Sequence, residues 1–510
     1  MWRIIVFMRQ IFNLCGKIYI YYLRMSPYII LLTLAVYIFV LFLLSYFSGR
    51  RTDNAGFFIG GRRTSWYVAT LAMIGAAMSG VTYISVPGSV AADSFSYMQM
   101  VVGFTIGQAV LALWLVPMFY RRGVLSLYEY LDERFGQQAH HAGAWCFLLA
   151  KLIGAALKIY VVCAVMQILV FDYFKLNIIY NIILTMLLVW LYTRRGGVRS
   201  LIVTDVLQSL CLVVSLVVVI YYLCKAMGLS AASAVECVAS SPYSQMWFFD
   251  DPASPRYFWK MVAGGALCLI AMTGLDQDMM QRNLSCRTKR DSQINIFLTA
   301  LCQIGVILLF LVLGVLLYKY IDFANLPHPT SGDDVFAMVA VQGGLPYVVG
   351  IMFVIGLISS TYSAAGSALT SLTTAFTIDV MDGRKLFGEK QLSTIRHRVH
   401  AAMAVMMAAL IILFYHLGEG SVINTVFKIA GYTYGPILGM FVFGLCSKRE
   451  VRGKYIPLVA ILSPVLSYLL QWVAAEGFQY FIGFELLGYN ALFTIFGLIL
   501  ISKSIENEKK

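Results

Sequence analysis

The chain has 510 residues, of which 60% are hydrophobic and only 12% are charged, and its mean hydropathy is +0.79. Soluble proteins carry roughly 25% charged residues, so this composition excludes a soluble fold and requires a lipid bilayer as the surrounding solvent. The net charge of +13 would suggest a nucleic-acid partner in a soluble protein. In a membrane protein, however, the basic residues must first be tested as a topology signal.

A helix needs about 20 apolar residues to cross the hydrocarbon core. The sequence predicts thirteen such spans, at about 27–47, 66–90, 98–120, 143–171, 177–193, 201–224, 257–282, 294–321, 346–380, 397–416, 421–446, 454–474 and 487–503. We therefore expect a single transmembrane domain over 27–503 and a short cytoplasmic tail over 504–510. Residues 1–26 form a basic extension. It is either an interfacial amphipathic helix or the result of a start codon set too early, in which case Met25 would be the true first residue.

The basic residues indicate how the spans are oriented. Loops after odd-numbered spans hold most of the 38 lysines and arginines, among them Arg282. The opposite loops hold only Lys175, Lys225, Arg256 and Lys319. The positive-inside rule then places the N-terminus outside and the C-terminus in the cytoplasm of a cell membrane, which we expect to be a bacterial inner membrane.

Two spans contain residues that weaken a helix in mid-membrane. The span 66–90 carries Gly75, Gly80, Pro87 and Gly88, and the span 257–282, five helices later, carries a similar run of glycines. Broken helices release backbone carbonyls, and a cation can satisfy them. Close packing through small residues is the alternative for either span alone, but the matched positions favour a binding site.

The span 346–380 offers hydroxyl groups on one helix face. Ser360, Ser363 and Ser367 follow an i, i+3, i+7 spacing. Hydroxyl and carbonyl oxygens are suitable ligands for a hard cation such as sodium. A packing stripe of small residues would have the same spacing, so both interpretations remain open.

Ionisable residues inside a membrane are costly and therefore point to function. Asp205 lies one turn into its span, and we favour cation binding for it over a capping or salt-bridge role. Lys158 lies in mid-span and could contact an anionic substrate or pair with an internal carboxylate. Asp276 and Asp278, beside Arg282, are more typical of a structural ion pair.

Several segments, in the same order along the chain, resemble the solute:sodium symporter family. These segments are 57–62 (FFIGGR), 66–88, 126–136, 204–208 (TDVLQ), 276–282 (DQDMMQR) and 376–379. The resemblance implies an all-α membrane protein with the five-plus-five inverted repeat of the leucine-transporter type. The repeats would occupy 66–224 and 257–446, with extra helices at 27–47, 454–474 and 487–503.

The resemblance also implies particular binding residues. A shared sodium site would use Gly75, Met78, Ser360 and Ser363, although Ala364 stands where a hydroxyl residue is usual. A second sodium site, known in some members, would use Asp205, Ser363 and Ser367, with Gly366 in place of a further serine. The implied substrate lining is Ser79, Thr82, Tyr97, Gln99, Lys158, Met272 and Gln303.

Together these features predict a symporter that imports a small organic solute with co-transported sodium by alternating access. Lys158 favours an organic anion or an acidic sugar such as sialic acid. The resemblance also implies that a neutral hexose would be poorly hydrogen-bonded, because Thr82 and Leu269 stand where the sodium/galactose relatives carry polar Gln and Asn groups. The alternatives are a solute-sensing module, or a symporter for a neutral sugar, polyol or amino acid. We expect no enzymatic activity and no catalytic residues, no nucleic-acid partner and no obligatory protein partner.

Overall fold

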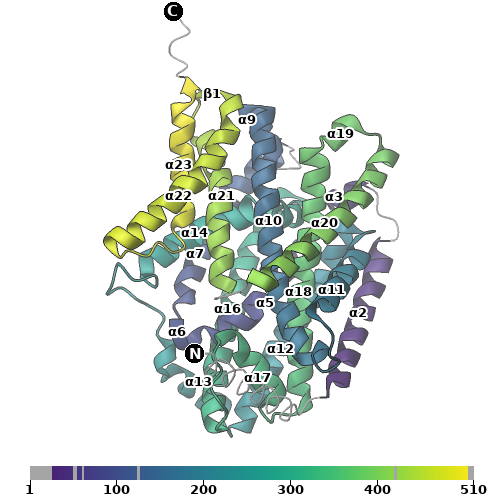
Figure 1. Cartoon of the computed structure of the whole chain (residues 1–510), viewed down its shortest axis with the longest axis vertical. Coiled ribbons are helices and arrows are strands. Elements are labelled where there is room, and N and C mark those ends of the chain that lie inside the picture. Colours follow the sequence, from purple (N-terminus) through teal and green to yellow (C-terminus); the bar gives the residue numbers. More distant parts are fainter. Residues whose placement is uncertain (1–25, 50–53, 60–61, 123–126, 418–421, 504–510) are drawn as a thin grey trace, which may run out of the picture.

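The computed structural model describes residues 26–49, 54–59, 62–122, 127–417 and 422–503. The predicted tail and all but the last residue of the predicted extension lie outside these ranges. The described chain is a bundle of long helices that run side by side, with short helices and loops at both ends (Figure 1). The prediction of an all-α membrane fold is confirmed.

The first half of the described chain contains the helices that its apolar runs predict, together with short helices between them such as α3, α9 and α13. They are α2 (Pro27–Gly49), α3 (Asn54–Ile59), α4 (Trp66–Ala77), α5 (Gly80–Gly88), α6 (Val90–Asp93), α7 (Tyr97–Val110), α8 (Val116–Arg122), α9 (Leu127–Phe135), α10 (Gln137–Met166), α11 (Ile178–Thr193), α12 (Gly197–Ala226) and α13 (Ala231–Ala239). Wider π-helical turns continue α7 over Leu111–Leu115 and α10 over Gln167–Phe171.

The second half adds the remaining helices and one small two-stranded sheet. Its elements are α14 (Phe258–Leu269), α15 (Gln277–Leu284), α16 (Lys289–Phe323), α17 (Gly332–Gln342), α18 (Tyr347–Ala375), α19 (Gly383–Leu386), α20 (Glu389–Leu417), α21 (Val422–Cys446), β1 (Glu450–Val451), α22 (Ile456–Phe478), α23 (Leu486–Leu500) and β2 (Ser502–Lys503). Strands β1 and β2 pair antiparallel. Wider turns extend α14 over Ile270–Gly274 and α18 over Phe376–Val380.

Nine of the described helices are long and apolar enough to cross a membrane, or up to eleven if each of two bent pairs counts as one span. Two shorter apolar helices, α11 and α23, coincide with the predicted spans 177–193 and 487–503. The multi-pass architecture is therefore clear, while the exact count of thirteen spans stays a prediction. Large apolar side chains such as Phe39 of α2 and Ile461 of α22 are exposed on the bundle, as a lipid-facing surface requires.

Both expected helix breaks are present. Helices α4 and α5 are bent by 61° relative to each other, and α14 with its π-helical extension is bent by 67° relative to α15. Helix α18 packs against both α4 and α5, α12 packs against α4 and α18, and α7 packs against α14. The two breaks therefore lie inside the bundle, where protein groups rather than lipid surround the released backbone.

Candidate functional site

A cavity of about 170 Å³ lies beside the two helix breaks. Its wall is formed by residues from α4, α5, α7, α10, α14, α15, α16, α18 and α21. Apolar side chains such as Phe104 and Ile307 make up much of the lining, and a few polar groups are placed among them. Such a lining is typical of a small-molecule site, in which apolar surface provides affinity and a few polar groups provide specificity.

Most of the predicted substrate residues line this cavity. They are Ser79, Thr82, Tyr97, Lys158, Met272 and Gln303, together with the predicted sodium ligand Met78. The other predicted sodium residues, Gly75, Asp205, Ser360, Ser363 and Ser367, are not part of the lining and lie behind it on α4, α12 and α18.

Gln99 does not belong to the cavity lining, which corrects the sequence-based assignment. Its side-chain amide donates to the carbonyl of Arg256 at 2.9 Å and accepts from the backbone N–H of Phe248 at 3.0 Å. The side chain is fully buried in these contacts. Gln99 thus anchors the loop between α13 and α14, and its offset of two positions from Tyr97 turns it to another side of helix α7.

Lys158 is the cavity-lining lysine that has no ion-pair partner among the described residues. It lies in the C-terminal half of α10 and lines the cavity wall, and no carboxylate of the described residues lies within ion-pairing distance of its ammonium group. The alternative of pairing with an internal carboxylate is therefore wrong for this conformation. A positive charge in a largely apolar cavity attracts an anion, because the ammonium group has lost most of its hydration.

The break between α4 and α5 releases backbone oxygens. Met78 has extended dihedral angles (φ −94°, ψ 98°) and Ser79 begins the next helix (φ −82°, ψ 167°). Within the described chain, no hydrogen bond reaches the carbonyl oxygens of Gly75 or Met78. These carbonyls can therefore serve as cation ligands, as the sequence predicts.

Close packing brings helix α18, which carries several hydroxyl groups, and helix α12, which carries Asp205, to this break. A side chain at Gly75 would place its Cβ 2.5 Å from Ser209 Oγ, and one at Gly80 would lie 2.5 Å from Thr361 Oγ1, so only glycine permits the approach. Ser360 Oγ donates to the carbonyl of Leu357 at 2.9 Å. Its oxygen lone pairs remain available beside the break.

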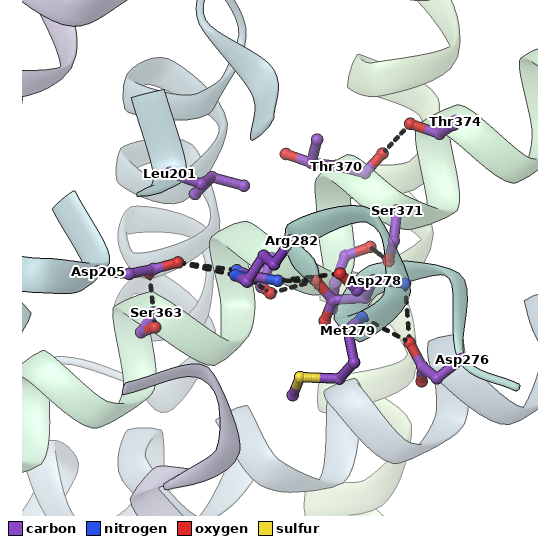
Figure 2. A network of polar contacts seen from close by, with 12 residues as sticks. Leu201, Asp205, Asp276, Asp278, Met279, Arg282, Ser363, Thr370, Ser371 and Thr374 are labelled. Carbon is purple, nitrogen blue, oxygen red and sulfur yellow. Dashed lines mark hydrogen bonds and ion pairs between the residues drawn. The ribbon is translucent and has the colours of Figure 1, made fainter. Parts of the chain in front are cut away.

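Behind the break, a buried network surrounds the guanidinium of Arg282 (Figure 2). Its Nε and Nη2 donate to Asp205 Oδ2 at 3.0 and 2.9 Å, and Nη2 also donates to Ser367 Oγ at 2.5 Å. Nη1 donates to the Asp278 carboxylate and to the Asp278 carbonyl. Asp205 thus forms a salt bridge, the role that the sequence favoured less, and Arg282 is buried rather than part of a loop.

The network continues to the cavity wall through Asp276, Lys151 and Tyr434. Lys151 donates to Asp276 Oδ2 at 3.0 Å and to Asp278 Oδ2 at 2.8 Å, and Tyr434 donates to Asp276 Oδ2 at 2.6 Å. The predicted ion pairing of Asp278 with Arg282 is present, but Asp276 pairs with Lys151 of another helix instead. Lys151 is therefore neutralised, in contrast to Lys158 two turns away.

Gln108 is a cavity residue that is absent from the predicted lining. Its amide donates to Gln303 Oε1 at 3.0 Å, which joins α7 to α16 across the cavity wall. Gln108 follows Tyr97 by eleven residues, a spacing that places both on one face of a helix. The helical spacing from Tyr97 could therefore have identified Gln108 as a lining residue.

Comparison with known proteins relates the chain to membrane transporters. The model of the sodium:solute symporter family matches residues 57–453. The human sodium/iodide cotransporter is 26% identical over 412 residues, which cover 78% of this chain and 62% of that protein. The zebrafish (Danio rerio) sodium-coupled monocarboxylate transporter 2 is 25% identical over 84% of this chain and 68% of that protein. The chain thus spans about two thirds of the length of these relatives.

Solved structures show the same fold. A sodium-coupled sialic acid symporter in a substrate-bound outward-open state superposes with a TM-score of 0.77 at 18% identity, covering 94% of this chain and 99% of that one. A nucleobase-cation-symport-1 family transporter in a closed conformation gives a TM-score of 0.57 at 13% identity, over 88% of this chain and 94% of that one. These similarities confirm the leucine-transporter-type architecture.

Proposed function

Because the chain belongs to the sodium:solute symporter family, we propose that it imports a small organic anion together with sodium by alternating access. The choice of an anionic substrate rests on Lys158, a cavity-lining ammonium group with no acidic partner among the described residues. A carboxylate can supply the missing partner, and the apolar lining can hold the remainder of a small substrate.

Two kinds of relative support this choice of substrate. The names of the similar proteins specify iodide and monocarboxylates, which are all anions. The similar fold of a sialic acid symporter adds an acidic sugar to the candidates. A neutral sugar, polyol or amino acid would leave the Lys158 charge without a counter-ion inside the bundle, which is costly.

Sodium would bind between two elements: the break that joins α4 to α5, and helix α18. The free carbonyls of Gly75 and Met78 and the hydroxyls of Ser360 and Ser363 supply oxygen ligands from two elements. An ion held by both elements favours the conformation in which they are close and orders the cavity next to it. Separation of the ligands in the inward-open conformation would then release the ion.

We further propose that the C-terminal end of the chain faces the cytoplasm and that the N-terminus lies outside, in a bacterial inner membrane. Figure 1 places α9, α19 and β1 together at one end of the bundle, and α13 and α17 at the other. Arg134, Arg384 and Lys385 lie on α9 and α19, so the basic loops share one end. This segregation agrees with the positive-inside rule.

Uptake into proteoliposomes of purified protein tests the proposed function. With an inward sodium gradient, we expect accumulation of at least one of two radiolabelled organic anions, pyruvate and sialic acid, and none of galactose. Replacement of external sodium by potassium should abolish this uptake, because the driving ion is then missing. Anion uptake that is equal in potassium, or galactose uptake without anion uptake, would contradict the proposal.

Replacing Ser363 by alanine should raise the sodium concentration for half-maximal uptake several-fold. The change removes one oxygen ligand, and a single neutral hydrogen-bonding group is worth about 0.5–1.5 kcal/mol. Ser371→Ala is the matched control, because Ser371 lies on the same helix and its hydroxyl only donates to the carbonyl of Ala368. An unchanged sodium dependence in Ser363→Ala would mean that the ion binds elsewhere.

A further inference from the structure

The oxygens of Asp205, Ser363 and Ser367 form a ready-made cation site: one carboxylate and two hydroxyls that converge from α12 and α18. In the structure two of these three groups already contact a cation. The guanidinium of Arg282 contacts Asp205 and Ser367 directly, and Ser363 donates to the other carboxylate oxygen of Asp205 at 2.7 Å (Figure 2).

The hydrogen bonding of Arg282 is complete. A guanidinium has five N–H donors. Two of them reach Asp205, one reaches Ser367, and two reach the side chain and carbonyl of Asp278. Arg282 is 2% exposed, and Ser367 also donates to Asp278 at 2.6 Å. The guanidinium therefore has no free donor, as expected of a permanent constituent of the fold.

The charges of this network also balance for one sodium ion and not for two. The network contains three carboxylates, Asp205, Asp276 and Asp278, and two basic groups, Lys151 and Arg282. One formal negative charge is left over. A single sodium ion at the helix break neutralises it, while an anion in the cavity neutralises Lys158. A second sodium ion would add an unpaired positive charge next to a guanidinium, which repels it.

We propose that Arg282 is a tethered cation that takes the place of a second sodium ion, so that one sodium ion accompanies one monovalent anion in each transport cycle. This inference rests on the proposed function and specifies its stoichiometry. Because one positive and one negative charge move together, the cycle carries no net charge. Both the empty and the fully loaded carrier are then electrically balanced inside the membrane.

Binding of radioactive sodium to the purified full-length protein tests the proposal without any substrate. We expect one sodium ion per wild-type chain. Arg282→Met keeps much of the side-chain volume but removes the charge, so it should bind two. The double variant Arg282→Met with Asp205→Asn removes the opposite charge as well and should return to one. Two ions per wild-type chain would overturn the proposal, as would a folded Arg282→Met variant that still binds one.

The membrane potential provides a second, independent measurement. In proteoliposomes with a potassium-diffusion potential of 100 mV, negative inside, wild-type accumulation of a monovalent anion should not change. Transport with two sodium ions would carry one net charge, and the same potential would raise accumulation about 50-fold. Should Arg282→Met fail to fold, the wild-type sodium count and this voltage test still decide the question. A wild-type chain that binds no sodium would instead refute the proposed function.

Discussion

The Lys158→Met variant should lose anion uptake while it still binds sodium. Lys158 is the only ammonium group of the described cavity wall that has no carboxylate partner, because Lys151 is held by Asp276 and Asp278. A hydrogen bond between charged groups contributes about 1.5–3 kcal/mol, which corresponds to a loss of roughly 10- to 150-fold in uptake efficiency. The sodium ligands lie on α4 and α18, so sodium binding should remain close to that of the wild type.

Two variants separate a substrate contact from a general effect of charge. Lys158→Arg keeps the positive charge and should retain part of the uptake, with a changed preference among anions because of its planar geometry. Lys428→Met removes a lysine from the exposed face of α21, outside the cavity lining, and should leave uptake unchanged. If Lys158→Met transports the same anion as efficiently as the wild type, Lys158 does not bind the substrate.

The Lys151→Met variant should be strongly destabilised. The side chain of Lys151 is 15% exposed and bridges Asp276 and Asp278, whose side chains are 3% and 5% exposed. Removing one partner of a buried ion pair leaves an uncompensated charge and costs about 3–5 kcal/mol. We expect a clearly lower melting temperature in detergent, measured by thermal unfolding of the purified protein.

A surface lysine with a similar arrangement provides the control. Lys385 also lies between two acids, Asp382 at 3.4 Å and Asp132 at 3.7 Å, but its side chain is 65% exposed. Exposed ion pairs contribute about 0–1 kcal/mol, so Lys385→Met should leave the melting temperature nearly unchanged. Adding Asp276→Asn to Lys151→Met should restore part of the lost stability, because it removes the carboxylate that has lost its basic partner, whereas Asp278 keeps Arg282. Equal melting temperatures for Lys151→Met and the wild type would show that the buried network does not stabilise the fold.

The helix breaks show how much of the site can be predicted from the chain itself. Glycine and proline weaken a helix wherever they occur, and a released carbonyl in a membrane needs a partner, so local sequence is enough to locate the break near Gly75 and Gly80. The binding roles of Gly75, Met78 and Ser79 come from the resemblance to the family and stay a prediction. Tyr97 and Thr82 line the cavity, as predicted, because they lie close to that break. The prediction for Gln99 is wrong, because the orientation of its side chain depends on Phe248, which is 149 residues away.

The amino-acid sequence by itself determined the membrane class, the apolar runs and the two breaks. Each of these depends on composition or on neighbours within a few turns. It also indicated the pairing of Asp278 with Arg282, which are four residues apart on one helix.

Only the tertiary structure decided which buried charge meets which partner. Arg282 is 77 residues from Asp205, and the two meet because α12, α15 and α18 pack around the same point. Lys151 and Lys158 look alike in the sequence, yet helix packing gives two carboxylates to the first and none to the second. Ion pairing inside a membrane acts over a few ångströms in space, and distance along the chain does not report it.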